Sequence, residues 1–137
     1  MTLVVDASMA IAWLFADERS ATPQEVLRQV AAEGAYAPSL WKLEVANVLR
    51  GAVRRKRCDA KYAARSLQRL ERLQITIDAE TDTHAWGRTR QLSEKYDLTM
   101  YDAAYLELAI RRVGSLASRD AALAAAARKA GLEVLGA

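Results

Sequence analysis

The sequence alternates short apolar runs with longer segments of helical periodicity, and this alternation constrains the fold more than any other feature. The apolar runs cover residues 3–5, 35–37, 75–77, 115–117 and 133–135. Helices are expected at residues 8–15, 23–33, 39–56, 60–73, 82–96, 101–113 and 120–130. Strands that alternate with helices in this way predict an α/β fold with a central, mainly parallel β-sheet.

Length and composition predict a single domain over residues 1–137, because 137 residues of which 52% are hydrophobic can bury one core of ordinary size. Cys58 is the only cysteine, so no intrachain disulfide is expected, and a reducing, cytoplasmic location is favoured. The start has no basic leader, and the longest uncharged stretch is ten residues. About 20 are needed to span a bilayer, so we expect neither a signal peptide nor a membrane segment.

Carboxylates are the main candidates for catalytic groups, because the sequence lacks the usual motifs of other catalytic sites. His84 is the only histidine, which excludes a multi-histidine metal site and a structural zinc site of Cys/His type. Glycine-rich phosphate-binding motifs and the serine-hydrolase elbow are absent from the sequence. A metal held by carboxylates is expected to be a hard cation such as Mg²⁺ or Mn²⁺.

Two acidic residues follow predicted strands. Asp6 comes directly after the first apolar run and Asp120 shortly after the fourth. The carboxyl ends of parallel strands are where open α/β sheets bind ligands. Each residue also has a simpler interpretation as the N-cap of the next helix, with Ser8 as another candidate cap for the first one.

Two further acidic residues interrupt apolar helical stripes. The first stripe, at helical spacing, comprises Leu40, Leu43, Glu44, Asn47, Val48 and Gly51. A buried Glu44 must meet a cation, shift its pKa or face a wet cleft, and a salt bridge to an arginine is the simplest alternative. Asp102 shares a second stripe with Tyr105, Leu106, Ala109 and Ile110, and Thr99-x-x-Asp102 also fits a capping box.

We call Asp6, Glu44, Asp102 and Asp120 the acidic cluster, because a sheet with helices on its faces can gather all four at one edge. Such carboxylates repel one another unless divalent cations neutralise them. This arrangement suits metal-assisted phosphodiester hydrolysis, which needs no histidine. Three neutral polar residues, Ser8, Asn47 and Ser118, are placed to orient the carboxylates.

Basic residues concentrate between residues 50 and 72. Nine basic residues against two acidic ones give this segment a charge of +7, whereas the rest of the chain carries −4. Four of them repeat on one helix face, which we call the basic face: Lys61, Arg65, Arg69 and Arg72. This face predicts an RNA-binding surface that follows a phosphate backbone, although a solvated helix face is the simpler interpretation.

Four stretches together resemble a known family, the PIN-domain ribonucleases, and within it the VapC-type toxins of type II toxin–antitoxin systems. The stretches are VVDASMAIAWLF, PSLWKLEVANVL, LTMYDAAYLELAI and LASRDAALAAAARKAG, and they occur in the family's order over essentially the whole chain. Ser118 stands where threonine is more usual in the family, a change that keeps the hydroxyl.

The resemblance implies a three-layer α/β/α sandwich in which the acidic cluster holds Mg²⁺ or Mn²⁺. Ser8 and Asn47 match the family's supporting hydroxyl and amide positions. It further implies a homodimer, cleavage of structured RNA such as transfer or ribosomal RNA, and inhibition by a cognate VapB-type antitoxin.

Two other functions compete with a metal-dependent ribonuclease toxin. In the first, the chain is a non-catalytic PIN-like module that binds RNA or protein, and the acidic residues only cap helices. In the second, it is a phosphatase of the haloacid dehalogenase type. That chemistry needs an acid two residues after Asp6, where this chain has Ser8.

Overall fold

The computed structural model describes residues 2–18 and 20–136, which form five short strands connected by helices. The strands are β1 (Leu3–Val5), β2 (Ala35–Ala37), β3 (Ile75–Ile77), β4 (Ser115–Ala117) and β5 (Val134–Leu135). The helices are α1 (Ala7–Leu14), α2 (Ala21–Glu33), α3 (Trp41–Arg54), α4 (Ala60–Glu71), α5 (Thr81–His84), α6 (Arg90–Tyr96), α7 (Met100–Arg111) and α8 (Ala121–Lys129). A short 3₁₀ turn, η1 (Ala16–Glu18), follows α1, and a π-helical turn, η2 (Ala85–Thr89), separates α5 from α6.

The five strands form a parallel sheet in the order β3-β2-β1-β4-β5. Central strand β1 pairs on both sides, with Val4 opposite Tyr36 of β2 and Leu116 of β4. The chain first moves outward from β1 to β3 and then returns to place β4 on the other side of β1. The carboxyl ends of β1 and β4 therefore meet at the topological switch point, where open α/β sheets bind ligands.

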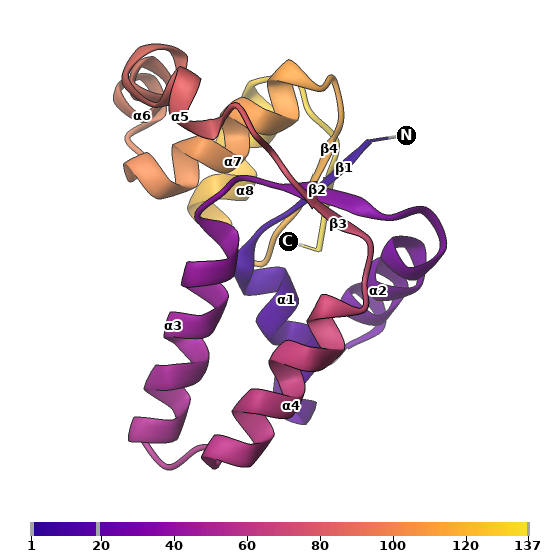
Figure 1. Cartoon of the computed structure of the whole chain (residues 1–137). Helices are drawn as coiled ribbons and strands as arrows, with labels where there is room; N and C mark the ends of the chain where they lie inside the picture. The colour runs from indigo at the N-terminus through magenta and orange to yellow at the C-terminus, as the bar shows by residue number, and fades with distance from the viewer. Residues whose placement is uncertain (1, 19, 137) are drawn as a thin grey trace.

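Helices cover both faces of this sheet. Right-handed crossovers require the helices that connect β1 to β3 to lie on one face and those that connect β3 to β5 to lie on the other. Figure 1 shows this arrangement, with α1–α4 on one side of the strands and α5–α8 on the other. The predicted α/β sandwich with a central parallel sheet is confirmed. No helix in the described part of the chain is long and apolar enough to cross a membrane.

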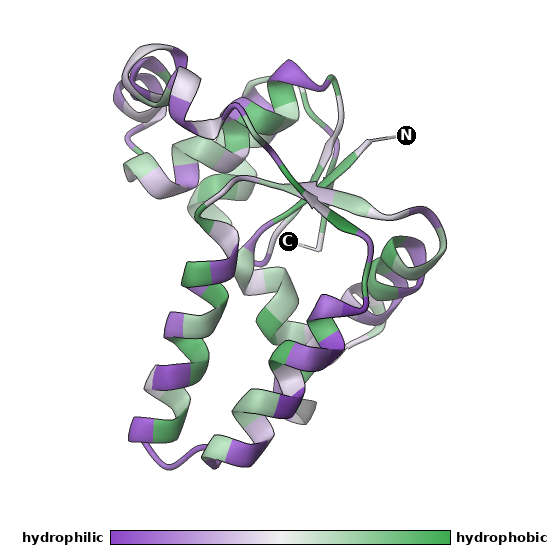
Figure 2. Ribbon diagram, in the orientation of Figure 1, coloured by the Kyte–Doolittle hydropathy of each residue, from purple (hydrophilic) through white to green (hydrophobic). Residues whose placement is uncertain are grey.

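The core lies between the sheet and the helices on each face. The strand residues Val4, Val5 and Leu116 are fully buried, and Figure 2 shows that apolar colouring dominates the strands and the inner helices. In α8, the alanine-rich run packs through Leu123 and Ala127, which are also fully buried. The small side chains of this run let the helix approach the sheet closely.

The buried face of α3 differs from the predicted one. Leu43 is 77% exposed and Val48 is 38% exposed, so the predicted stripe of Glu44 does not face the core. The core face instead consists of Trp41, Val45, Leu49 and Ala52, which follow the same helical spacing one residue later. Burial of the large indole ring of Trp41 sets the rotation of the helix, and both adjacent stripes are apolar enough to have fitted the pattern.

The helix predicted over residues 82–96 consists of α5, the π-helical turn η2 and α6. Gly87 lies in the π turn, where its weak helix propensity makes a departure from regular α-helix less costly. Trp86 is 88% exposed on this turn, whereas Trp13 and Trp41 are buried in the core.

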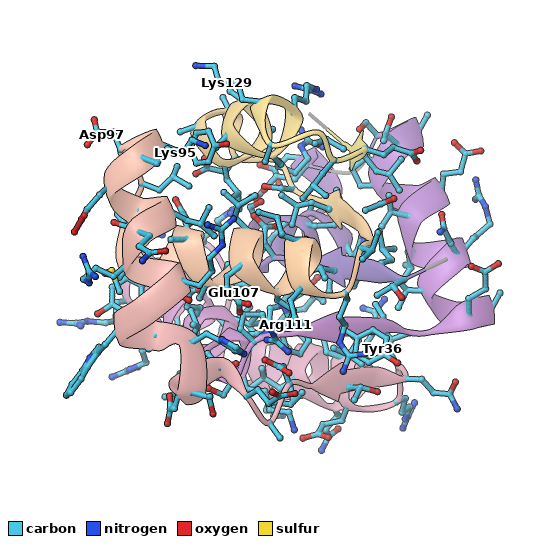
Figure 3. The ribbon with its side chains drawn as sticks, turned by 90° about the horizontal axis from the view of Figure 1, so that it is seen from above. Tyr36, Lys95, Asp97, Glu107, Arg111 and Lys129 are labelled. Carbon is cyan, nitrogen blue, oxygen red and sulfur yellow. The ribbon has the colours of Figure 1, made fainter. Side chains whose placement is uncertain are left out.

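A buried ionic cluster, which the sequence patterns did not reveal, joins the end of β3 to α7. Arg111 Nη2 donates to Asp78 Oδ2 at 2.5 Å, and Arg111 Nε donates to Glu107 Oε2 at 2.8 Å. Both carboxylates are 3% exposed, and Figure 3 shows Glu107 and Arg111 close together on α7. Burial alone would raise the pKa of Asp78, but the hydrogen bonds and charge of Arg111 outweigh it and lower that pKa. The ion pair thus ties the C-terminal end of α7 to the end of β3.

Candidate functional site

Asp6 lies at the carboxyl end of β1 and is 4% exposed. It caps α1, because Met9 N donates to its Oδ1 at 2.9 Å. The capping interpretation is therefore correct, yet capping satisfies only part of this carboxylate. The hydroxyl of Ser8 lies 2.8 and 2.9 Å from its two oxygens, and the hydroxyl of Ser118 donates to Oδ2 at 2.6 Å. Three donors, two from the first turn of α1 and one from the loop after β4, hold the side chain in one orientation.

The two serines also fix the loop that follows β4. Arg119 N donates to Ser8 Oγ at 2.8 Å, and Asp120 N donates to Ser118 Oγ at 3.0 Å. Asp120 in turn caps α8 by accepting from Leu123 N at 2.9 Å. Ser8 and Ser118 thus bond both to the Asp6 carboxylate and to the backbone of the loop that carries Asp120.

Glu44 lies in the first turn of α3 and is half-buried. Its side chain accepts a hydrogen bond at 2.5 Å from the hydroxyl of Tyr105 on α7. Across the described residues, no lysine, arginine or histidine lies within ion-pair distance of Glu44. The salt-bridge alternative was thus wrong, and Glu44 remains a carboxylate without a cationic partner.

Tyr105 is the residue of the site that sequence reasoning placed only in an apolar stripe. Burial raises the pKa of its hydroxyl, and so do the hydrogen bond to Glu44 and the charges of Glu44, Asp6 and Asp102. Tyr105 therefore stays protonated and acts as a donor. The presence of a tyrosine in an apolar stripe could have indicated this role, because a buried tyrosine hydroxyl usually requires a polar partner.

Asp102 lies in the first turn of α7, where its N–H donates to the capping hydroxyl of Thr99 at 3.1 Å. The capping half of the predicted box is therefore present. The pKa of the Asp102 carboxyl is raised from its ordinary 3.8 to about 6 by burial and by the charges of Asp120, Asp6 and Glu44. The structure thus brings all four members of the acidic cluster into electrostatic range.

The pKa of Asp6 is raised as well. Burial is the largest cause, the charge of Asp120 adds to it, and hydrogen bonds from Ser118, Met9 and Ser8 oppose it. Two carboxyls at one sheet edge thus resist ionisation where no nearby cation compensates them. This is the electrostatic environment that a divalent cation would relieve.

The donor set fits an oxygen-liganded cation, although the side chains do not form a finished cage. Among residues 2–18 and 20–136, no three Asp, Glu, His or Cys side chains converge closely enough to hold a metal ion. The four carboxylates come from the ends of β1 and β4 and from the first turns of α3 and α7. Carboxylates without histidine or cysteine are the ligands that Mg²⁺ and Mn²⁺ prefer.

The remaining predicted site residues lie on the α3–α4 hairpin. Asn47 is exposed one turn after Glu44, and its side chain makes no hydrogen bond to another described residue. The basic face is solvent-exposed, and its members run along α4 and its C-terminal cap: Lys61, Arg65, Arg69 and Arg72. Figure 1 shows that α3 and α4 project from the sheet as a hairpin, and Glu44 lies in the first turn of α3.

Comparison with solved structures supports this architecture. PAE2754 from Pyrobaculum aerophilum superimposes with a TM-score of 0.72 at 22% identity, over 98% of this chain and 83% of that one. FitAcB from Neisseria gonorrhoeae superimposes with a TM-score of 0.67 at 14% identity, over 97% of this chain and 96% of that one. The Mycobacterium tuberculosis toxin VapC20, which cleaves the sarcin-ricin loop, gives 0.65 at 16% identity, over 91% and 95%.

Comparison of the sequence with family models and with curated proteins gives two results. A search of curated proteins found no match. The model of the PIN domain matches residues 3–134, which include every strand of the sheet up to the first residue of β5 and all four acids of the cluster. The chain therefore belongs to the PIN domain family.

Proposed function

We propose that this protein is a metal-dependent endoribonuclease of the VapC toxin type, which hydrolyses RNA phosphodiester bonds. One observation carries the proposal. Four carboxylates from four separate elements act on one another at the switch point of a parallel sheet, and together with burial they raise the pKa of Asp102 to about 6. Among the described residues no lysine, arginine or histidine pairs with these carboxylates, and mutually repelling carboxylates of this kind are typical of a site that binds divalent metal.

In the proposed mechanism, Asp6, Glu44, Asp102 and Asp120 would hold Mg²⁺ or Mn²⁺ at the strand edge. Such an ion would supply activation of a water nucleophile and neutralisation of charge on the phosphate oxygens. The chain's own residues supply orientation: Ser8 and Ser118 fix the Asp6 carboxylate by hydrogen bonds. Asn47, one turn after Glu44 on α3, is proposed to contact the metal-ligand or phosphate oxygens.

The basic face of α4 is proposed to bind the RNA backbone. Lys61, Arg65 and Arg69 are exposed, and none of them has an ion-pair partner among the described residues. Free cationic side chains on one helix can neutralise successive phosphates. Structural similarity to VapC20, a toxin that cleaves the sarcin-ricin loop, supports structured RNA of the transfer or ribosomal class as the substrate.

The proposal includes a cognate VapB-type antitoxin, a homodimer and action in the cytoplasm. Large apolar side chains are exposed on α3 next to Glu44, on η2, and at the start of α7 next to Asp102: Leu43, Trp86, Met100 and Tyr101. Apolar exposure of this kind is typical of surfaces that another protein chain covers. The exposed residues next to Glu44 and Asp102 support a protein partner beside the acidic cluster.

The second candidate is a non-catalytic PIN-like module that binds RNA or protein. It is favoured by the capping roles, because Asp6 and Asp120 both accept from backbone N–H groups at helix N-termini. Capping does not explain Glu44, which caps no helix and bonds to Tyr105 instead. The two candidates differ in whether a divalent metal matters.

Incubation of the purified protein with bulk transfer RNA and ribosomal RNA tests the proposal. We expect cleavage with Mg²⁺ or Mn²⁺, loss of cleavage in EDTA, and recovery when the metal is restored. Growth arrest on expression, relieved by co-expression of an adjacent antitoxin gene, is the matching result in cells. RNA binding without cleavage at any metal concentration would favour the non-catalytic module.

A further inference from the structure

Tyr105 occupies an unusual position, because its ring belongs to the core while its hydroxyl belongs to the acidic cluster. The side chain is 1% exposed and is among the largest fully buried side chains of the described residues. It projects from α7, whose residues from Ala103 to Ala109 are all buried. Its hydroxyl donates to Glu44 Oε1 at 2.5 Å, although the two residues are 61 positions apart in the sequence.

This hydrogen bond determines where the Glu44 carboxylate can lie. Glu44 is half-buried on α3, and in the described part of the chain no other hydrogen bond or ion pair holds its side chain. Its neighbour Leu43 is 77% exposed, so the surrounding helix surface gives little packing to restrain a flexible glutamate. A donor whose ring is locked in the core is therefore the main restraint on this carboxylate.

We propose that Tyr105 is a positioning residue of the metal site, which holds the Glu44 carboxylate toward Asp102 and Asp6 through its hydroxyl. The proposal rests on the proposed metal-binding function of the acidic cluster. Tyr105 donates one hydrogen bond to Oε1 and leaves Oε2 free to bind a cation. Groups that orient a ligating carboxylate in this way act on metal affinity without touching the ion.

A purely structural role for Tyr105 makes a different prediction. In that case the hydroxyl contributes only to the stability of the fold, as any satisfied buried donor does. Tyr62 provides a matched comparison, since its hydroxyl donates to the backbone carbonyl of Leu14, away from the acidic cluster. Tyr105→Phe and Tyr62→Phe each remove one hydroxyl and keep the ring.

Calorimetric titration with Mn²⁺ alone, together with thermal unfolding, tests the proposal on the full chain. We expect Tyr105→Phe to weaken Mn²⁺ binding by about tenfold, a typical effect of losing a group that orients a metal ligand. Tyr62→Phe should bind Mn²⁺ as the wild type does. Cleavage by Tyr105→Phe should recover as Mn²⁺ is raised, whereas a structural defect would not be rescued by metal.

A double variant shows whether the hydroxyl acts through Glu44. We expect Tyr105→Phe added to Glu44→Gln to cause no further loss of Mn²⁺ affinity, because the carboxylate that it orients is already gone. Should Tyr105→Phe not fold, Tyr105→Met removes the hydroxyl with a flexible apolar side chain, and the same criteria apply.

The outcomes separate this proposal from the proposed function. Tyr105→Phe that binds Mn²⁺ within twofold of a metal-binding wild type overturns the role of Tyr105 and leaves the metal site intact. A wild type that binds no Mn²⁺ overturns the proposed function itself, and with it this inference. Tenfold weaker binding in both tyrosine variants also contradicts the proposal, because it would show a general effect of lost hydroxyls.

Discussion

The hydroxyl of Ser118 donates to Asp6 Oδ2 at 2.6 Å, although the two residues are 112 positions apart. Their strands, β4 and β1, are neighbours only because the chain reverses its direction across the sheet after β3. The hydrogen bond therefore depends on the strand order, and it joins the two loops that carry Asp6 and Asp120. Ser118 is fully buried, so water does not compete for its hydroxyl.

Replacement of Ser118 by alanine should weaken both the fold and the metal site. The buried Asp6 carboxylate would lose one of its donors, and we expect the free energy of unfolding to fall by about 1–3 kcal/mol. Mn²⁺ affinity should fall by about tenfold, since an orienting group is removed. Urea unfolding and Mn²⁺ titration measure the two effects separately.

Ser66→Ala is the matched control for that experiment. Ser66 is 1% exposed in α4, and its hydroxyl is buried without a hydrogen-bond partner. Its loss should leave stability unchanged or slightly improved, because an unsatisfied polar group is removed. Equal destabilisation by Ser66→Ala and Ser118→Ala would show that the bond to Asp6 has no special importance.

The raised pKa of Asp102 predicts a pH dependence of stability in the absence of divalent metal. The pKa of Asp102 is about 6 in the folded protein, against 3.8 for the unfolded chain. Its contribution to stability is therefore fully present below pH 3.8 and is lost as the pH rises through about 6. Asp102→Asn stays neutral, so its free energy of unfolding should fall less than that of the wild type between pH 4.5 and 7, by about 1–2 kcal/mol. Urea titrations across that range measure the difference, and parallel curves would contradict it.

The basic face should control RNA affinity and its salt dependence. We expect replacement of its four members by alanine to reduce the slope of log affinity against log salt by up to about 3, because about 0.7 counterions are released per phosphate contact on single strands. Filter binding in an Asp6→Asn background measures affinity without cleavage. The residues changed are Lys61, Arg65, Arg69 and Arg72.

A second quadruple variant controls for net charge. It replaces four exposed basic residues on other elements by alanine: Arg28, Arg88, Lys95 and Lys129. Figure 3 labels Lys95 and Lys129. This variant should keep most of the wild-type salt slope. If both variants lose the same slope, RNA binding depends on overall charge rather than on the α4 surface.

The buried ionic cluster predicts a large effect of Arg111→Met on stability. The change leaves the buried carboxylates of Asp78 and Glu107 facing each other without a cation, and we expect a loss of about 2–4 kcal/mol. Arg90→Met is the control, because Arg90 pairs with Glu94 on the surface at 2.7 Å and should cost at most about 1 kcal/mol. Similar thermal midpoints for the two variants would contradict a structural role for the Arg111 cluster.

Much of the fold could be predicted from sequence because strands and helices differ in period and length. The five apolar runs coincide with the strands except that β5 begins at Val134, and the glycine after α2 closes that helix with a positive φ of 77°. The rotation of α3 could not be predicted, because two adjacent stripes are both apolar and only packing decides between them. Exposed Trp86 lies on a π-helical turn, which the periodicity of the sequence does not reveal.

Only part of the candidate site could be predicted from the sequence, because packing between helices decides the rest. Asp6 and Asp120 follow strands, so their place at the sheet edge could be predicted. Glu44 was selected because its stripe was expected to be buried, whereas its side chain is only half-buried. Its partner Tyr105 lies on another helix, and a contact between residues 61 positions apart follows from tertiary packing alone. The pairing of Arg111 with Asp78 is equally long-range.

The central claim is that the acidic cluster binds the metal that cleaves RNA, and the rate of cleavage by Asp6→Asn tests it most directly. The measurement compares wild type, Asp6→Asn and the exposed control Asp82→Asn on one RNA, with saturating Mn²⁺ and with EDTA. We expect metal-dependent cleavage by the wild type and the control, and a loss of at least about 100-fold in Asp6→Asn, since a metal ligand contributes several kcal/mol to the transition state. Cleavage by Asp6→Asn within twofold of the wild type, or cleavage that persists in EDTA, would contradict it.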